Sequence, residues 1–191
     1  MQHIEARFNE HKNVALYYQC WLPTKLTKAV LLIVHGLVEH SGRYINVVNY
    51  FVPKGYAVCS FDYQGHGKSE GIRGYVKQFS CYLDDLKSFL GIVRNMYPKN
   101  RIFIVGHSVG GTIAATFAIN HQDEFNGLVL SGATIKPGAS LPRLKIVLVN
   151  LLALMLPKMG VDIIDASAIS RDKAVVDAYV NDPLVCVPWQ D

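Results

Sequence analysis

Four short apolar runs, separated by segments with helical patterns, constrain the fold of this chain most strongly. The runs are residues 29–34, 56–61, 102–105 and 127–131. Uninterrupted apolar runs of this length are typical of strands that are covered on both faces. Because helical patterns lie between them, we predict an α/β fold with a mostly parallel sheet and flanking crossover helices. A preceding segment of mixed polarity, 14–21, predicts an antiparallel outer strand.

The third run breaks at a glycine and restarts as a helix of small residues. The break has the pattern G-x-S-x-G, from Gly106 to Gly110 with Ser108 at its centre. In this arrangement the serine lies on a sharp strand-to-helix turn and its hydroxyl is exposed. A side chain at Gly106 or Gly110 would collide across so tight a turn. Ser108 is therefore a candidate nucleophile for acyl transfer, and the alternative is that it merely caps the following helix.

A serine that attacks a carbonyl group needs N–H donors that stabilise the developing oxyanion. The Val109 amide follows the serine directly at a helix N-terminus and is the first expected donor. The second is expected from the loop after an earlier strand, where His35, Gly36 and Leu37 follow the run at 29–34. We predict that the Leu37 amide is this second donor.

Composition and charge exclude several functional classes. The chain has 191 residues with 18% charged residues and a net charge of +4. It lacks a basic run, so we expect no nucleic-acid partner. Its four cysteines show no C-x-x-C spacing, and we therefore expect neither a zinc site nor a redox motif. Unpaired cysteines and an N-terminus without an apolar segment predict a cytoplasmic protein.

The sequence changes in character after the run at 127–131. Prolines and glycine punctuate a loop, and an apolar segment of eleven residues, 146–156, follows. This segment is too short to span a bilayer. It is interpreted either as a packed helix of a cap or as an exposed lid, for which 141–157 would provide peripheral membrane contact. We therefore expect an α/β core at 1–135 and a helical cap or lid segment at 136–191.

Four segments in order resemble the monoacylglycerol lipases, which are serine hydrolases of the α/β-hydrolase fold. These segments are residues 35–44, 62–71, 106–111 and 169–185. The resemblance implies that Ser108 is the nucleophile and that Leu37 and Val109 form the oxyanion hole, supported by His35, Gly36, Gly106 and Gly110. It also implies an apolar cap, lipid or glycerol ester substrates and no cofactor.

The resemblance also implies a catalytic Asp and His that follow strands beyond the cap. The sequence stops at Asp191 and contains no histidine after His121. We therefore expect a C-terminally truncated member in which the final strands are missing. One hypothesis is an active ester hydrolase acting on glycerol esters or short and medium acyl chains. The other is a catalytically impaired remnant that binds acyl lipids or self-associates through the sheet edge at 127–131 or the lid.

Overall fold

The computed structural model describes residues 1–9, 14–135 and 166–185. Six strands form one sheet in the order β1-β2-β4-β3-β5-β6. Their bounds are β1 Gln2–Asn9, β2 Ala15–Leu22, β3 Ala29–Val34, β4 Tyr56–Phe61, β5 Arg101–His107 and β6 Gly127–Ser131. The last four strands pair in parallel, whereas β1 and β2 join antiparallel at one edge. This confirms the predicted mostly parallel α/β sheet.

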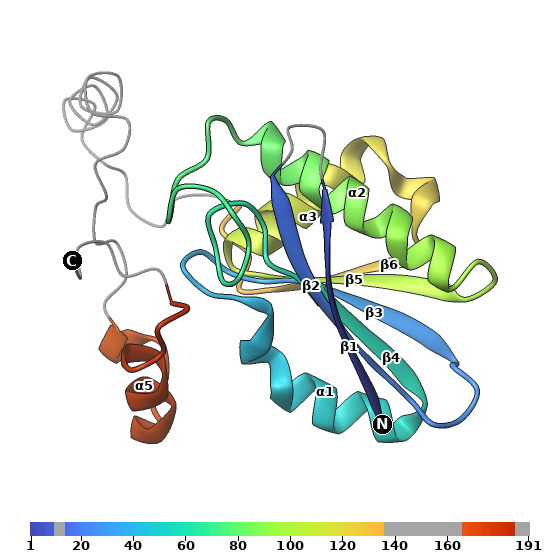
Figure 1. The fold of residues 1–191 in the computed structure, drawn as a ribbon, viewed down its shortest axis with the longest axis horizontal. Coiled ribbons are helices and arrows are strands. Elements are labelled where there is room, and N and C mark those ends of the chain that lie inside the picture. The colour runs from blue at the N-terminus through green and yellow to red at the C-terminus, as the bar shows by residue number, and fades with distance from the viewer. Residues whose placement is uncertain (10–13, 136–165, 186–191) are drawn as a thin grey trace.

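Three helices cover the two faces of the sheet, as Figure 1 shows. Helix α1 (Ile45–Phe51) lies on one face, while α2 (Ser80–Met96) and α3 (Val109–Asn120) lie on the other. Side chains of β3 alternate between the two resulting cores. Val30 and Leu32 pack with α2 and α3, whereas Leu31 and Ile33 pack with α1. Burial on both faces explains why β3 is continuously apolar.

The N-terminal edge differs from the expectation. The predicted outer strand at 14–21 is β2, and it is not outermost, because β1 pairs along its whole length. The side chains of β1 alternate between exposed and half-buried positions, so its sequence carries little apolar signal. Pairing with β2 therefore specifies this strand more than its own composition does.

The cysteines also differ from the expectation. The antiparallel register of β2 and β4 places Cys20 opposite Cys59, and the two form a disulfide. Cys81 is free and buried. The prediction of four unpaired cysteines is therefore wrong at this pair, and Cys186 lies outside the described residues. Among the described residues, no helix is both long enough and apolar enough to cross a membrane.

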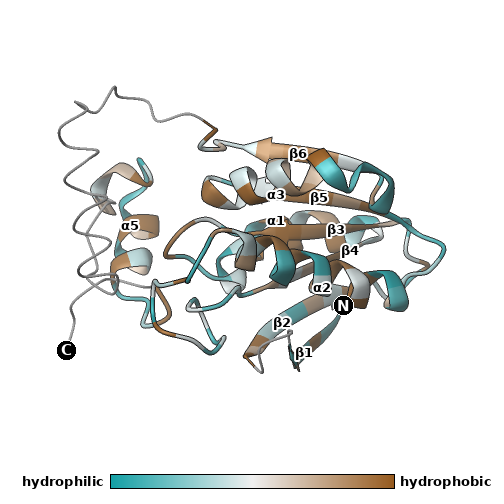
Figure 2. Ribbon diagram, turned by 90° about the horizontal axis from the view of Figure 1, so that it is seen from above, coloured by the Kyte–Doolittle hydropathy of each residue, from teal (hydrophilic) through white to brown (hydrophobic). Residues whose placement is uncertain are grey.

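A final helix, α5 (Lys173–Val180), stands apart from the sheet on the side where the loops after β3 and β4 lie (Figure 1). The segments 136–165 and 186–191, which include the predicted apolar lid at 141–157, lie outside the described residues. At the opposite edge from β1, β6 is an apolar strand, as its colour in Figure 2 shows.

Candidate active site

The carboxyl ends of β3 and β5 place two loops side by side. Val34 pairs with Gly106 in the parallel register, so the loop that begins at His35 adjoins the turn that contains Ser108. This edge, beyond the carboxyl ends of parallel strands, is where α/β folds usually bind ligands. The structure thereby brings together the two loops that the sequence singled out.

Ser108 has a strained backbone between β5 and α3. Its φ is 50° and its ψ is −121°, a conformation that L-residues rarely adopt. The Ser108 amide donates to the carbonyl oxygen of Ser131 at 2.9 Å. The side chain is half-buried and makes no capping hydrogen bond to α3. Ser108 thus occupies the N-cap position, but its hydroxyl does not cap the helix within the part of the chain that the structure describes.

Two glycines make this turn sterically feasible. A Cβ on Gly110 would overlap the carbonyl oxygens of Val34 and His35. A Cβ on Gly106 would lie 2.6 Å from the carbonyl oxygen of Gly110, closer than side-chain carbons approach in proteins. The small residues therefore let the start of α3 contact the end of β3, as the sequence predicted.

The neighbouring loop is held by side chains on two sides. The Tyr63 hydroxyl donates its one proton chiefly to the carbonyl oxygen of Gly36 at 2.6 Å and shares it with the carbonyl oxygen of His35 at 3.0 Å. On the other side, the Gly36 amide donates to Glu39 Oε2 at 3.0 Å. Arg43 and the Tyr44 hydroxyl in turn contact the Glu39 carboxylate. The loop ends in a strained position, because the β-branched Val38 has a φ of 55°.

The two proposed oxyanion donors lie on these adjoining loops. Val109 is the first residue of α3, where the amides have no partner within the helix. Leu37 lies in the turn that follows Gly36 and is half-buried. Neither amide donates to another group within residues 1–9, 14–135 and 166–185. Their joint action on an oxyanion is still a prediction.

The histidines near the site are structural in this geometry. His35 and His66 are fully buried, and burial lowers the pKa of each to about 3. His107 contacts the carbonyl oxygen of Ser131 at 3.1 Å. In the described part of the chain, no histidine is hydrogen-bonded to Ser108. A neutral imidazole with so low a pKa is a weak base, so neither buried histidine suits proton abstraction.

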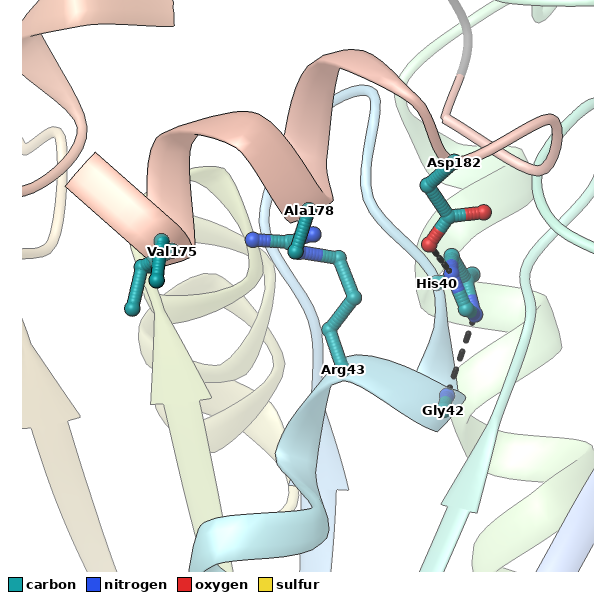
Figure 3. Close-up of a pocket in the computed structure, with 7 residues that line it drawn as sticks. His40, Gly42, Arg43, Val175, Ala178 and Asp182 are labelled. Carbon is teal, nitrogen blue, oxygen red and sulfur yellow. Dashed lines mark hydrogen bonds and ion pairs between the residues drawn. The ribbon is translucent and has the colours of Figure 1, made fainter.

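The sequence did not indicate how α5 is attached to the site loops. Figure 3 shows the contact: His40 Nε2 and Asp182 Oδ2 lie 2.8 Å apart, and Arg43 reaches toward α5. The Arg43 guanidinium lies 4.7 Å from the centre of the Tyr179 ring. Burial raises the pKa of Asp182, but hydrogen bonds from His40 and the Leu184 amide lower it by more, so the net shift is downward.

A cavity of about 350 Å³ lies between α5 and the loop at 40–43. It is lined by His40, Gly42, Arg43, Ala174, Val175, Ala178 and Asp182. The cavity does not include Ser108, so it is not the predicted acyl site. Among the described residues, no group of three or more His, Cys, Asp or Glu side chains is placed to hold a metal ion.

The sheet order, the strained serine turn and the flanking helices are those of the α/β-hydrolase fold. The chain belongs to the family described as serine aminopeptidase, S33, whose model matches residues 25–189. The structure superposes on a soluble variant of monoglyceride lipase from Saccharomyces cerevisiae with a TM-score of 0.81 and 25% identity. The match covers 96% of this chain and 62% of that chain.

Comparison with curated proteins also finds monoacylglycerol and monoglyceride lipases. A monoacylglycerol lipase from Mycolicibacterium smegmatis is 33% identical over 90% of this chain and 61% of the relative. The Homo sapiens monoglyceride lipase is 36% identical over 90% of this chain and 57% of the relative. The chain thus spans about three fifths of the length of these relatives. The predicted resemblance to the monoacylglycerol lipases is confirmed.

Proposed function

We propose that this chain carries the nucleophile of a serine ester hydrolase of the monoacylglycerol lipase type. The observation that supports this most is the half-buried Ser108 side chain, held without a capping bond on a strained turn beside the Gly36 loop. Its substrates would be carboxylic esters of glycerol or of short and medium acyl chains. Relatives that are named monoacylglycerol and monoglyceride lipases support this substrate class.

In the proposed reaction, Ser108 Oγ attacks the ester carbonyl carbon and a general base takes the hydroxyl proton. The Leu37 and Val109 amides stabilise the negative charge on the former carbonyl oxygen. Collapse of this intermediate breaks the bond to the alcohol oxygen, which takes the proton back from the base and leaves as the alcohol. Water then hydrolyses the acyl-enzyme to the carboxylic acid and free Ser108. The base would be a group other than His35 and His66, whose lowered pKa values make them unsuitable.

The proposal includes the organisation predicted from the sequence. Residues 1–135 would form the hydrolase core, and residues 136–191 would contribute the cap that includes α5. The segment 141–157 would contact a membrane surface peripherally in an otherwise cytoplasmic protein. No cofactor or nucleic acid takes part in the proposed chemistry.

The edge strand β6 supports the predicted self-association. Val129 is 53% exposed and Leu130 is 40% exposed, and β6 ends the sheet within the described residues. An apolar edge strand with open backbone groups favours pairing with a second copy. Light scattering should therefore give a mass above that of the monomer, and Leu130→Lys should lower it. A monomeric wild-type protein at high concentration would refute this part of the proposal.

Ester hydrolysis by the wild type and Ser108→Ala tests the proposed activity. Turnover of a short p-nitrophenyl ester and of a monoacylglycerol should fall to background in Ser108→Ala. Ser131→Ala is the matched control, because this serine ends the neighbouring strand and its amino-acid change is identical. Equal turnover in the wild type and Ser108→Ala would contradict the hydrolase and favour the alternative, a domain that binds acyl lipids or self-associates.

A further inference from the structure

Two peptide groups flank Gly36, one joining it to His35 and one joining it to Leu37, and different side chains hold each of them. The carbonyl oxygen of Gly36 accepts hydrogen bonds from the Tyr63 hydroxyl at 2.6 Å and from His35 Nδ1 at 2.7 Å. These two donors occupy both lone pairs of that oxygen. The peptide before it is held by the Gly36 amide, which donates to Glu39, and by the His35 oxygen, which lies 3.0 Å from the Tyr63 hydroxyl and shares its single proton with the Gly36 oxygen.

Peptide planarity converts this into a direction for the Leu37 amide. In a trans peptide the C=O and N–H groups are rigidly coplanar and point in opposite directions. No described peptide bond is cis. Because the Gly36 oxygen points at the fully buried Tyr63, the Leu37 N–H must point away from that buried side. Among the residues that the structure describes, the Leu37 N–H is thus the one polar group of these two peptides without a hydrogen-bond partner, and it is the proposed oxyanion donor.

The residue at position 36 makes such a restraint necessary. Glycine has no Cβ, and it adopts positive and negative φ values with similar ease. The Gly36–Leu37 peptide could therefore rotate at little cost in backbone energy if its oxygen were not held. A rotated peptide would present a carbonyl oxygen where the oxyanion develops, and the two partial negative charges would repel each other.

Tyr63 is itself rigidly placed. It lies two residues after the end of β4, the neighbour of β3 in the sheet. Its ring stacks on the His35 ring with centroids 3.8 Å apart and meets His66 edge-on at 4.6 Å. A side chain packed on several sides has little rotamer freedom, so the Tyr63 hydroxyl donates to the loop from a fixed position.

We propose that Tyr63 is a positioning residue for the oxyanion hole, which it serves by fixing the orientation of the Gly36–Leu37 peptide. This inference rests on the proposed hydrolase function. Tyr63 touches no reacting atom and acts through the Leu37 amide.

Tyr63→Phe tests the inference, because it removes the hydroxyl and keeps the packed ring. Losing an oxyanion donor outright costs on the order of 100- to 1000-fold in kcat. Since His35 Nδ1 still binds the Gly36 oxygen, we expect a smaller loss of roughly 10-fold in kcat, with KM changed less than about twofold. The affinity for a boronic acid, which forms a tetrahedral adduct with the serine, should fall by about the same factor as kcat/KM.

Tyr97→Phe is the matched control. Tyr97 is half-buried at the end of α2, far from the Gly36 loop in sequence, and its hydroxyl lies beside Thr27, whose side chain lowers the pKa that burial raises. It loses one hydroxyl contact, as Tyr63→Phe does, but kcat and boronate affinity should keep their wild-type values. A role of Tyr63 in stability alone would lower the melting temperature without the selective loss in kcat.

The outcomes separate this inference from the proposed function. If turnover depends on Ser108 and Tyr63→Phe matches Tyr97→Phe in kcat and boronate affinity, the positioning role is overturned and the hydrolase stands. If the wild type shows no turnover that depends on Ser108, the proposed function fails, and the inference that rests on it fails with it. A selective loss in kcat and boronate affinity supports both.

Discussion

Acidification from pH 7 to pH 5 should destabilise the fold through His66. Burial lowers the pKa of this histidine to about 3, with a further lowering from the nearby His35, whereas an unfolded histidine has a pKa of about 6.5. At pH 5 the unfolded chain therefore binds a proton at this residue and the folded chain does not. Stability is fully present above pH 6.5 and is lost progressively as the pH falls toward 3.

The expected magnitude follows from the two pKa values. At pH 5 the pH lies about 1.5 units below the unfolded-state pKa and above the folded-state pKa. Protonation of the unfolded chain therefore lowers the free energy of unfolding by about 2 kcal/mol. The result changes little for any folded-state pKa below about 4, so it depends mainly on burial. The same reasoning applies to His35, where burial again dominates and a hydrogen bond with the Gly36 oxygen opposes it.

Urea unfolding of the wild type and His66→Asn at several pH values measures this effect. Asparagine retains a donor near Nδ1, which contacts the Gln64 oxygen at 3.1 Å. Between pH 7 and 5 the variant should lose about 2 kcal/mol less unfolding free energy than the wild type. Between pH 7 and 8 the two should change in parallel, which serves as the control. Equal losses between pH 7 and 5 would refute the assignment of a buried, neutral His66.

Two further predictions concern the site loops and the cap helix. Gly110→Ala should cost roughly 1–3 kcal/mol, because its Cβ overlaps carbonyl oxygens at the end of β3. Thermal unfolding measures this cost. Gly91→Ala is the control, because a Cβ added there would meet no atom within 4 Å, and we expect it to raise the unfolding free energy by about 0.5–1 kcal/mol. Asp182→Ala should break the hydrogen bond with His40 and speed amide exchange in α5 about fivefold, equivalent to about 1 kcal/mol. Asp177→Ala on the exposed side of α5 should leave that exchange unchanged, and unchanged exchange in Asp182→Ala would contradict the tether.

The parallel part of the sheet could be predicted because its signal is local. The bounds of β3, β4 and β6 match the apolar runs, since strands buried on both faces require continuous apolar sequence. The edge strand β1 gave no such signal, because its side chains are largely exposed and its partner is β2. The Cys20–Cys59 pair likewise depends on the register between β2 and β4, which spacing along the chain does not reveal.

The candidate site also contains residues that could be predicted from local sequence and residues that could not. Ser108 and its flanking glycines were predictable, since a tight strand-to-helix turn restricts side-chain size at fixed positions. Tyr63 and Glu39 were not assigned a role, because each contacts the Gly36 loop only through the tertiary arrangement. One signal was present for Tyr63: it lies two residues after an apolar strand run, within a segment that carried the family resemblance. The attachment of α5 through Asp182 joins residues 142 positions apart and has no local signal.

Covalent labelling with a fluorophosphonate tests the central claim most directly, because this reagent reacts with an activated serine. We predict one adduct per chain, located by peptide mass spectrometry on the fragment that contains Ser108 and absent in Ser108→Ala. Labelling should persist in Ser131→Ala. An unlabelled wild-type protein, or an adduct on a different serine, would contradict the account of Ser108 as a nucleophile.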